Sequence, residues 1–358
     1  MKRIITLAAV TLMFVLPAFA QDDAQKAAAE AAAEMTTAPD TPVVPPKPKY
    51  WDLSLKNMLT FGQTFLSQWA AGGYNNYTLV ANIDGIANYA KDKVTWQNRL
   101  MMDYGFLYQA DKPILQKTTD RFYFLSTWGY STPVKHLNWS ATFDFTTQFN
   151  NNWAYGTPKS DGETEPTHKD WLNARTLKSG LFSPAYINLG FGIKWTPKPW
   201  LSVDFSPFTG GVVTVMDETL RAKYGMKLRS QYVDETGAPL PEYAGAILPS
   251  YYRGVRYEFG ARIIIDANWV INKTFTYGTT FKAFYNYLSP KIEPRITWDN
   301  RVSWNLAKYF ALVLNTYLIY DPLVIVRDTD NDGKADAKGV QFKEFLQFGF
   351  TYSIAGKK

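Results

Sequence analysis

Residues 252–269, YRGVRYEFGARIIIDANW, alternate between apolar and polar side chains almost without interruption. Successive side chains of a β-strand point to opposite faces, so this pattern predicts a strand with one apolar face and one charged face. The apolar face carries Val255, Tyr257, Phe259, Ala261, Ile263, Ile265, Ala267 and Trp269, and the other face carries Arg256, Glu258, Gly260, Arg262, Asp266 and Asn268. A strand of a soluble sheet can share this pattern, so the rest of the chain has to distinguish a soluble sheet from a membrane barrel.

The same alternation recurs along the chain after residue 50. The candidate strands lie near residues 51–62, 76–90, 94–109, 120–132, 137–150, 183–195, 200–216, 252–268, 274–288, 293–305, 309–320 and 340–354. Their number is even, as closure requires in a single-chain bacterial barrel. Strands that end in aromatic residues, together with an export signal, predict an all-β fold: a transmembrane antiparallel up-and-down β-barrel of about 12 strands.

The connections between these segments alternate in length. Tight turns are expected at residues 91–93, 133–136, 196–199, 270–273 and 307–308, and longer loops at residues 63–75, 110–119, 151–182, 217–251 and 321–339. Short periplasmic turns that alternate with long external loops are typical of outer-membrane barrels. The pattern therefore predicts a bacterial outer-membrane protein with both termini in the periplasm.

Composition excludes several other classes of protein. Beyond the N-terminus, no apolar stretch reaches the roughly 18 residues that a membrane helix needs, so a helical membrane protein is excluded. The net charge is +6 and the Lys and Arg residues are dispersed, which argues against a nucleic-acid partner. The chain has no cysteine, so it has no disulfide, thiol nucleophile or thiolate metal site. Aromatic residues make up 16% of the chain, which suits contact with outer-membrane lipid at two interfaces.

The N-terminus predicts export. Residues 1–20 combine a basic start, an apolar stretch from Ile4 to Leu16 and a small-x-small site ending at Ala20, as in a cleaved signal peptide. An uncleaved anchor helix is the alternative, which the short apolar stretch disfavours. An Ala/Glu-rich and then Pro-rich composition favours extended, solvated chain for residues 21–50. We therefore expect a signal peptide at 1–20, a disordered periplasmic leader at 21–50 and the barrel at 51–358.

The inward face of the predicted barrel carries charges of both signs. We expect the lumen to be lined by Arg99, Asp103, Asp144, Lys194, Arg256, Glu258, Arg262, Asp266, Lys282, Asp299 and Arg301. A pore selective for one sign of ion would show a ring of like charge, whereas mixed charges can pair across the interior. Twelve strands lie between the small barrels that side chains fill and the wide porins. The pattern favours a narrow or occluded lumen over a wide general porin.

Catalytic signatures are sparse. Outer-membrane hydrolysis usually needs a histidine as general base, and the chain has two histidines. His136 falls in a predicted periplasmic turn. His168 lies in a predicted external loop close to Asp161, Glu163, Glu165 and Asp170, where an Asp/His protease-like pair is conceivable and a plain solvated acidic loop is the simpler interpretation. We expect no catalysis, and a surface hydrolase that uses His168 remains the alternative.

One local motif has the spacing of a calcium loop. Asp328, Asp330 and Asp332 stand at positions one, three and five, and a glycine follows at position six. Lys334 would offer its backbone carbonyl, and Asp336 would bind Ca²⁺ directly or through water. Position twelve carries glycine in place of the usual bidentate glutamate, and Asp and Gly also make ordinary hairpin loops. Calcium binding and a plain loop both stay open.

Several short motifs resemble an uncharacterised family of outer-membrane β-barrels of Bacteroidetes type, the domain of unknown function 3078. The motifs begin at Ser67 (SQWAAGG), Trp96 (WQN), Tyr104 (YG), Asp120 (DR), Gln148 (QF), Ser183 (SPA), Ser206 (SP) and Gln341 (QFKE). The resemblance spans roughly residues 51–354. It implies a barrel in the outer membrane and brings no substrate or catalytic residue with it.

The sequence as a whole predicts a narrow or occluded channel or a surface scaffold of the outer membrane, without catalysis. A surface-exposed hydrolase is one alternative, and an accessory barrel of a secretion or assembly complex is another. Protein partners, if the chain has any, are not identified by its residues.

Overall fold

The computed structural model describes residues 50–65, 75–158, 166–289, 293–327, 329 and 336–355. These residues belong to a single compact unit that spans Lys49–Lys358.

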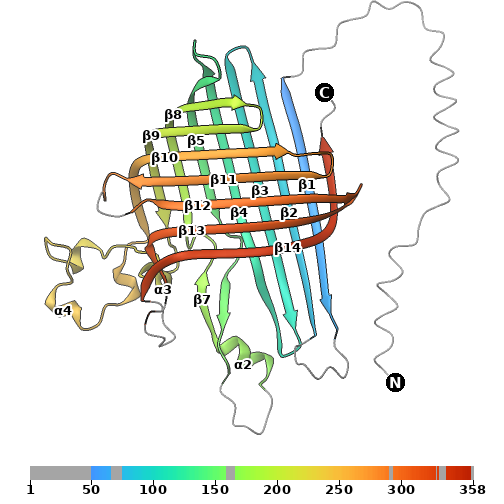
Figure 1. Cartoon of the computed structure of the whole chain (residues 1–358). Helices are drawn as coiled ribbons and strands as arrows, with labels where there is room; N and C mark the ends of the chain where they lie inside the picture. The colour runs from blue at the N-terminus through green and yellow to red at the C-terminus, as the bar shows by residue number, and fades with distance from the viewer. Residues whose placement is uncertain are drawn as a thin grey trace, which may run out of the picture. The chain divides into compact units, whose positions relative to one another are not determined.

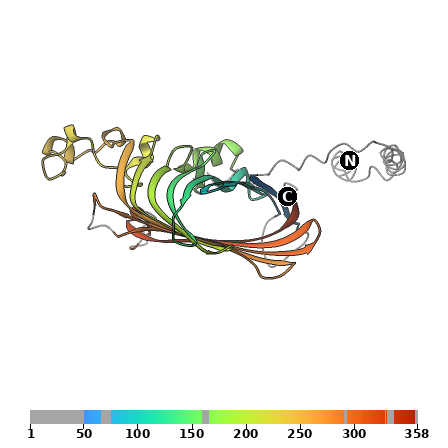
Figure 2. The ribbon, with the colours of Figure 1, turned by 90° about the horizontal axis from the view of Figure 1, so that it is seen from above.

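Twelve antiparallel strands close into a barrel, which confirms the predicted fold class. Each strand pairs with its neighbours in the ring β1-β14-β13-β12-β11-β10-β9-β8-β5-β4-β3-β2, in which β2 also pairs with β1. The strands are β1 (Trp51–Thr64), β2 (Asn76–Lys91), β3 (Val94–Gln109), β4 (Lys112–Ser131), β5 (Leu137–Thr147), β8 (Ala185–Lys198), β9 (Leu201–Thr214), β10 (Val255–Val270), β11 (Phe275–Asn286), β12 (Arg295–Ala307), β13 (Phe310–Arg327) and β14 (Ala337–Ala355). In cross-section the ring is flattened, so two broad walls face each other (Figure 2).

The two ends of the barrel differ. At one end, which we call the turn end, short turns join β2 to β3, β4 to β5, β8 to β9, β10 to β11 and β12 to β13, and the chain enters β1 and leaves β14 there. The opposite end, the loop end, carries the small elements between β5 and β8 and between β9 and β10 (Figure 1). These elements are β6 (Asn152–Tyr155), α2 (His168–Asn173), β7 (Arg175–Ser179), α3 (Glu218–Arg221), η2 (Ser230–Tyr232), α4 (Pro241–Ala244) and η3 (Pro249–Tyr251). No helix within the described ranges has the length and apolar character needed to cross a membrane.

Two of the predicted long loops are wrong. Residues 110–119 are mostly strand, because β4 begins at Lys112 and only Ala110 and Asp111 separate it from β3. Likewise β13 continues to Arg327, well into the predicted loop 321–339.

Proline explains both errors. Pro113 and Pro322 lack an amide donor and therefore suggest a loop, but both fall where the register of the hairpin shifts. A β-bulge at such a shift leaves a residue outside the ladder, so the strand can pass through a proline and resume pairing.

The outer face of the barrel is apolar. In β10, Tyr257 is 73% exposed and Trp269 is 53% exposed, whereas Glu258 and Arg262 on the inner face are buried. Aromatic pairs gather near both ends of this face. At the turn end they include Trp51/Trp96, Trp128/Tyr130, Trp200/Trp269 and Phe275/Trp304, and at the loop end Phe122/Phe149, Phe259/Tyr287 and Tyr285/Tyr287. An apolar band between two aromatic girdles is the surface that a bilayer solvates.

The junction between the first and last strands is the shortest in the ring. β1 and β14 pair only from Ser54 with Ala355 to Leu59 with Phe350, whereas β1 pairs with β2 along its whole length. Ring closure therefore depends on a few backbone hydrogen bonds near the turn end.

Two glycines allow the sheet to bend. Gly192 and Gly260 lie beside register shifts of the β8–β9 and β9–β10 pairs. A Cβ on Gly192 would lie 1.9 Å from the carbonyl oxygen of Phe205, and a Cβ on Gly260 would lie 1.9 Å from that of Tyr285. Only glycine therefore permits the close backbone approach at these bends.

We predict that Gly260→Ala destabilises the barrel by about 1–3 kcal/mol, because the new methyl group must displace backbone. Gly210→Ala is the matched control, since a Cβ there meets nothing within 4 Å. Urea unfolding of the refolded protein in detergent measures both. Equal unfolding midpoints for the two variants would contradict the close approach at Gly260.

Candidate functional site

Side chains inside the barrel join opposite walls. The key group is the guanidinium of Arg121 on β4, whose Nε donates to Asp103 Oδ2 on β3 at 2.8 Å and whose Nη1 donates to Asp299 Oδ2 on β12 at 3.1 Å. The guanidinium carbon also lies 5.1 Å from the ring centroid of Tyr317 on β13. β4 and β12 stand six places apart in the ring of twelve, the largest separation that the ring allows. We call Asp103, Arg121, Asp299 and Tyr317 the Arg121 bridge.

The Arg121 bridge lies between two chambers of the lumen. The loop-end chamber has a volume of about 680 Å³ and the turn-end chamber about 560 Å³. Asp103, Arg121 and Tyr317 line both chambers, and no other residue that the structure describes does so. Three of the four residues of the Arg121 bridge therefore lie where the two chambers meet.

Further contacts brace the lumen on both sides of the bridge. Lys194 on β8 donates to Gln97 on β3, and the hydroxyl of Tyr186 on β8 donates to Asp321 on β13 at 3.3 Å. The ammonium of Lys282 on β11 lies 3.7 Å from the ring centroid of Tyr123 on β4. These pairs join strands that are not neighbours in the ring, so they hold the two walls together.

The most deeply buried ion pair joins Arg262 on β10 to Asp144 on β5. Arg262 is 3% exposed and Asp144 is 5% exposed. Arg262 Nη1 donates to Asp144 Oδ1, and Nη2 donates to the carbonyl of Thr142 at 3.0 Å. Asn188 donates to the second oxygen of Asp144 at 2.9 Å, so the carboxylate is bound from two sides.

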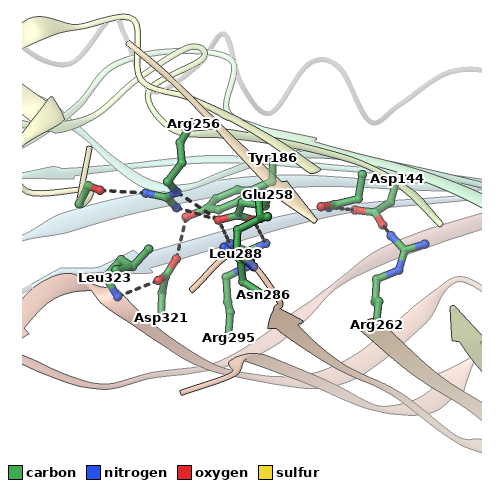
Figure 3. Close-up of polar contacts among 12 residues, drawn as sticks. Asp144, Tyr186, Arg256, Glu258, Arg262, Asn286, Leu288, Arg295, Asp321 and Leu323 are labelled. Atoms are coloured by element: carbon green, nitrogen blue, oxygen red, sulfur yellow. Dashed lines mark hydrogen bonds and ion pairs between the residues drawn. The ribbon is translucent and has the colours of Figure 1, made fainter. Parts of the chain in front are cut away.

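A second ionic cluster fixes a loop into the barrel mouth. Glu258 on β10 accepts from Arg295 on β12 at 3.1 and 3.2 Å and from Arg256 at 3.1 Å (Figure 3). Arg256 also donates to the carbonyls of Tyr224 and Gly225, at 3.1 Å each. The loop between β9 and β10 is thereby bound to the inner wall at the loop end.

The structure places every predicted lumen residue on the inner face, in four groups. Asp144, Arg262 and Lys282 line the loop-end chamber; Arg99, Lys194, Asp266, Asp299 and Arg301 line the turn-end chamber; Asp103 lines both. Arg256 and Glu258 form the ionic cluster at the mouth.

Arg121, the central residue of the bridge, is not among the lumen residues that the sequence predicts. Arg121 was predicted to lie at the start of a strand, whereas it sits well inside β4. The alternation along the strand could have placed Arg121 on the inner face, because Arg121 is in phase with Tyr123 and Thr127, which are both buried. Asp84, which binds Arg99 at 2.9 Å, is also not among the predicted lumen residues, although it is in phase with the buried Asn82.

The proposed calcium ligands mostly lie outside the described residues. Asp328, Asp330, Asp332 and Lys334 are among the residues not described, and the carboxylate of Asp336 accepts a hydrogen bond from the Thr329 amide at 3.0 Å. Within the described ranges, no three His, Cys, Asp or Glu side chains come together in a way that could hold a metal ion. Calcium binding stays a prediction.

His168 begins α2 at the loop end, and its nearest described acid has a structural role. The carboxylate of Asp170 accepts from the backbone amide and the hydroxyl of Thr167, at 2.8 and 2.6 Å, as part of a capping box. These hydrogen bonds from Thr167 hold the pKa of Asp170 below its ordinary value. Asp161, Glu163 and Glu165 lie outside the described residues.

The fold and its charged lumen define a β-barrel of the outer-membrane class. A family model described as "Protein of unknown function (DUF3078)" matches residues 61–153, which confirms the resemblance seen in the sequence over those residues. Five of the eight motifs, from Ser67 to Gln148, lie inside the matched residues. No curated protein matches the chain.

Solved outer-membrane barrels share this architecture at low identity. An outer membrane channel from Pseudomonas putida F1 is 10% identical, with 88% of this chain and 99% of that chain covered and a TM-score of 0.33. The translocator domain of the autotransporter NalP from Neisseria meningitidis is 7% identical, with coverage of 92% and 95% and a TM-score of 0.34. The NanC porin is 7% identical, with coverage of 84% and 97% and a TM-score of 0.31.

We predict that Arg262→Met destabilises the barrel by about 3–5 kcal/mol, because it leaves the buried Asp144 carboxylate without its cation. The double variant Arg262→Met/Asp144→Asn should recover much of that loss. Urea unfolding in detergent measures both. Lys338→Met, which removes an exposed ion pair with Glu293, is the control and should change the midpoint little. A double variant no more stable than Arg262→Met would refute the ion-pair explanation.

Proposed function

We propose that the protein is a narrow channel of the outer membrane for small polar solutes, held closed by the Arg121 bridge. The observation that carries this proposal is the arrangement of the two chambers along the lumen. Both have walls that combine charged and apolar side chains, and the same three side chains line both of them. Movement of one guanidinium and one tyrosine ring would join the chambers into a continuous path.

The ion pair between Arg121 and Asp299 is weak enough to open, as a gate requires. Arg121 and Asp299 keep 22% and 30% of their side-chain surface exposed, so water reaches the pair. An ion pair in contact with water is weaker than a fully buried pair, since water competes for both charges. The Arg262 pair, at 3% exposure, supports the wall instead.

The proposed orientation places the loop end outside the cell and the turn end in the periplasm, because external loops are the longer ones in outer-membrane barrels. The exported chain would then carry its leader, residues 21–50, in the periplasm. We propose no catalytic role, since Asp170 is committed to the cap of α2.

Planar-bilayer recording tests the channel. We expect low conductance from the unaltered protein and a severalfold higher conductance from Arg121→Ala/Asp299→Ala, because the variant removes both charges that span the lumen. Removal of the pair together avoids an unpaired Asp299, while Asp103 loses its arginine and keeps the hydrogen bond from Asn82 at 2.8 Å.

Lys135→Ala, in the exposed β4–β5 turn, is the control and should conduct like the unaltered protein. A gel-shift assay for heat-modifiable mobility checks that each variant is folded. A folded double variant with unchanged conductance would reject the Arg121 bridge as the gate.

A further inference from the structure

The loop-end chamber has the size and the walls of a ligand site. Its volume of about 680 Å³ falls within the range of small-molecule pockets, roughly 300–1,000 Å³. The walls combine charged groups with apolar and aromatic ones, which include Tyr186, Tyr224, Phe284, Ile319 and Val324. Such walls suit an organic molecule better than a stream of hydrated ions.

Every carboxylate that lines this chamber has a partner on the barrel. Asp103 binds Arg121, and Asp144 binds Arg262. Asp120 accepts from Lys117 at 2.7 Å and from two backbone amides, while Asp321 accepts from the Tyr186 hydroxyl and the Leu323 amide. The acidic groups are therefore already satisfied.

Three lysine amines of the same chamber have no described carboxylate in direct contact. Lys178, Lys223 and Lys282 have no carboxylate within 4.0 Å among the residues that the structure describes. Lys282 rests over the Tyr123 ring, and Lys223 donates to the carbonyl of Lys178 at 3.3 Å. Lys282 is attracted at longer range by Asp144, Asp299 and Asp266. The described lining nevertheless includes eight Lys and Arg side chains and four Asp side chains, so the chamber holds more positive charge than its own acids neutralise.

The two lysines of the mouth also act on each other. Lys223 follows α3, and Lys178 lies on β7, both in the loops outside the barrel strands. Burial and the nearby positive charge of Lys178 lower the pKa of Lys223. Two adjacent ammonium groups repel each other, and a bound anion would relieve that repulsion.

We propose that the loop-end chamber binds a small organic carboxylate, attracted by Lys178 and Lys223 at the mouth and held by Lys282 deeper in the lumen. The body of the ligand would contact the aromatic side chains. This inference rests on the proposed channel, because the chamber lies on its path, and it names the class of solute. The carboxylate could be carried by an aromatic ring or by a sugar. In both cases the lysine ammonium groups would bind the same carboxylate group.

Titration calorimetry on the full chain, refolded in an uncharged detergent at low salt, tests the proposal. The probes are benzoate and glucuronate, each with a neutral partner of similar body, benzamide and glucose. We expect at least one carboxylate to bind and its neutral partner to bind at least about tenfold more weakly, a difference of about 1.4 kcal/mol. The carboxylate that binds more tightly identifies the body that the walls prefer.

Variants assign the binding to the amines. Lys282→Met keeps the stem of the side chain over Tyr123 and removes the charge, and should weaken binding about tenfold, whereas Lys282→Arg should retain it. Lys223→Met, in a loop outside the strands, gives a second readout and should weaken binding less. Lys135→Met at the turn end is the control and should bind like the unaltered protein.

Three results would overturn the site: no heat from either carboxylate, equal affinity for a carboxylate and its neutral partner, or unchanged affinity in folded Lys282→Met and Lys223→Met. Inorganic phosphate that binds as tightly as the better carboxylate would overturn the assignment to an organic ligand. Binding is measured on the closed protein, so it does not require conduction. Carboxylate binding without any conductance gain in Arg121→Ala/Asp299→Ala would reject the channel and leave the site standing.

Discussion

Closure of the hydrogen-bonded ring is the constraint on which the rest of the molecule depends. Inside a bilayer no water is present to satisfy backbone amides and carbonyls, so a sheet can span the membrane only as a closed ring. Closure gives the chain two surfaces with opposite requirements. The outer surface must be apolar, and the inner surface is the only place within the membrane where strand residues such as Glu258 and Arg262 can be charged.

Flattening of the ring determines what those inner charges do. Because the two walls stand close together, Arg121 on β4 reaches Asp299 on β12, and Lys282 on β11 reaches the ring of Tyr123. In a round barrel of the same strand number, the same side chains would point into water. The interior is thus stabilised by ion pairs between walls, and the same pairs divide the lumen into chambers.

The sequence predicts the strands and their inner faces, but it does not predict the contacts between distant strands. Alternation along a strand is a local property, so all twelve strands and the inner face were predictable from residues such as those of 252–269. Strand ends were less predictable, because Pro113 and Pro322 resemble loop residues until the bulges that accommodate them are known. The partners of Arg121 could not be predicted at all, since the choice of Asp299 depends on the curvature of the whole ring and not on any spacing along the chain.

The short junction of β1 with β14 has a consequence for how the protein is made. The strand that begins at Trp51 finds its second neighbour only in residues near the C-terminal end of the described chain, Phe350 to Ala355. A ribosome must therefore finish β14 before any copy can become a cylinder. Until β14 pairs with β1, the outer edges of both strands keep unpaired amides and carbonyls, which are open to pairing with other chains.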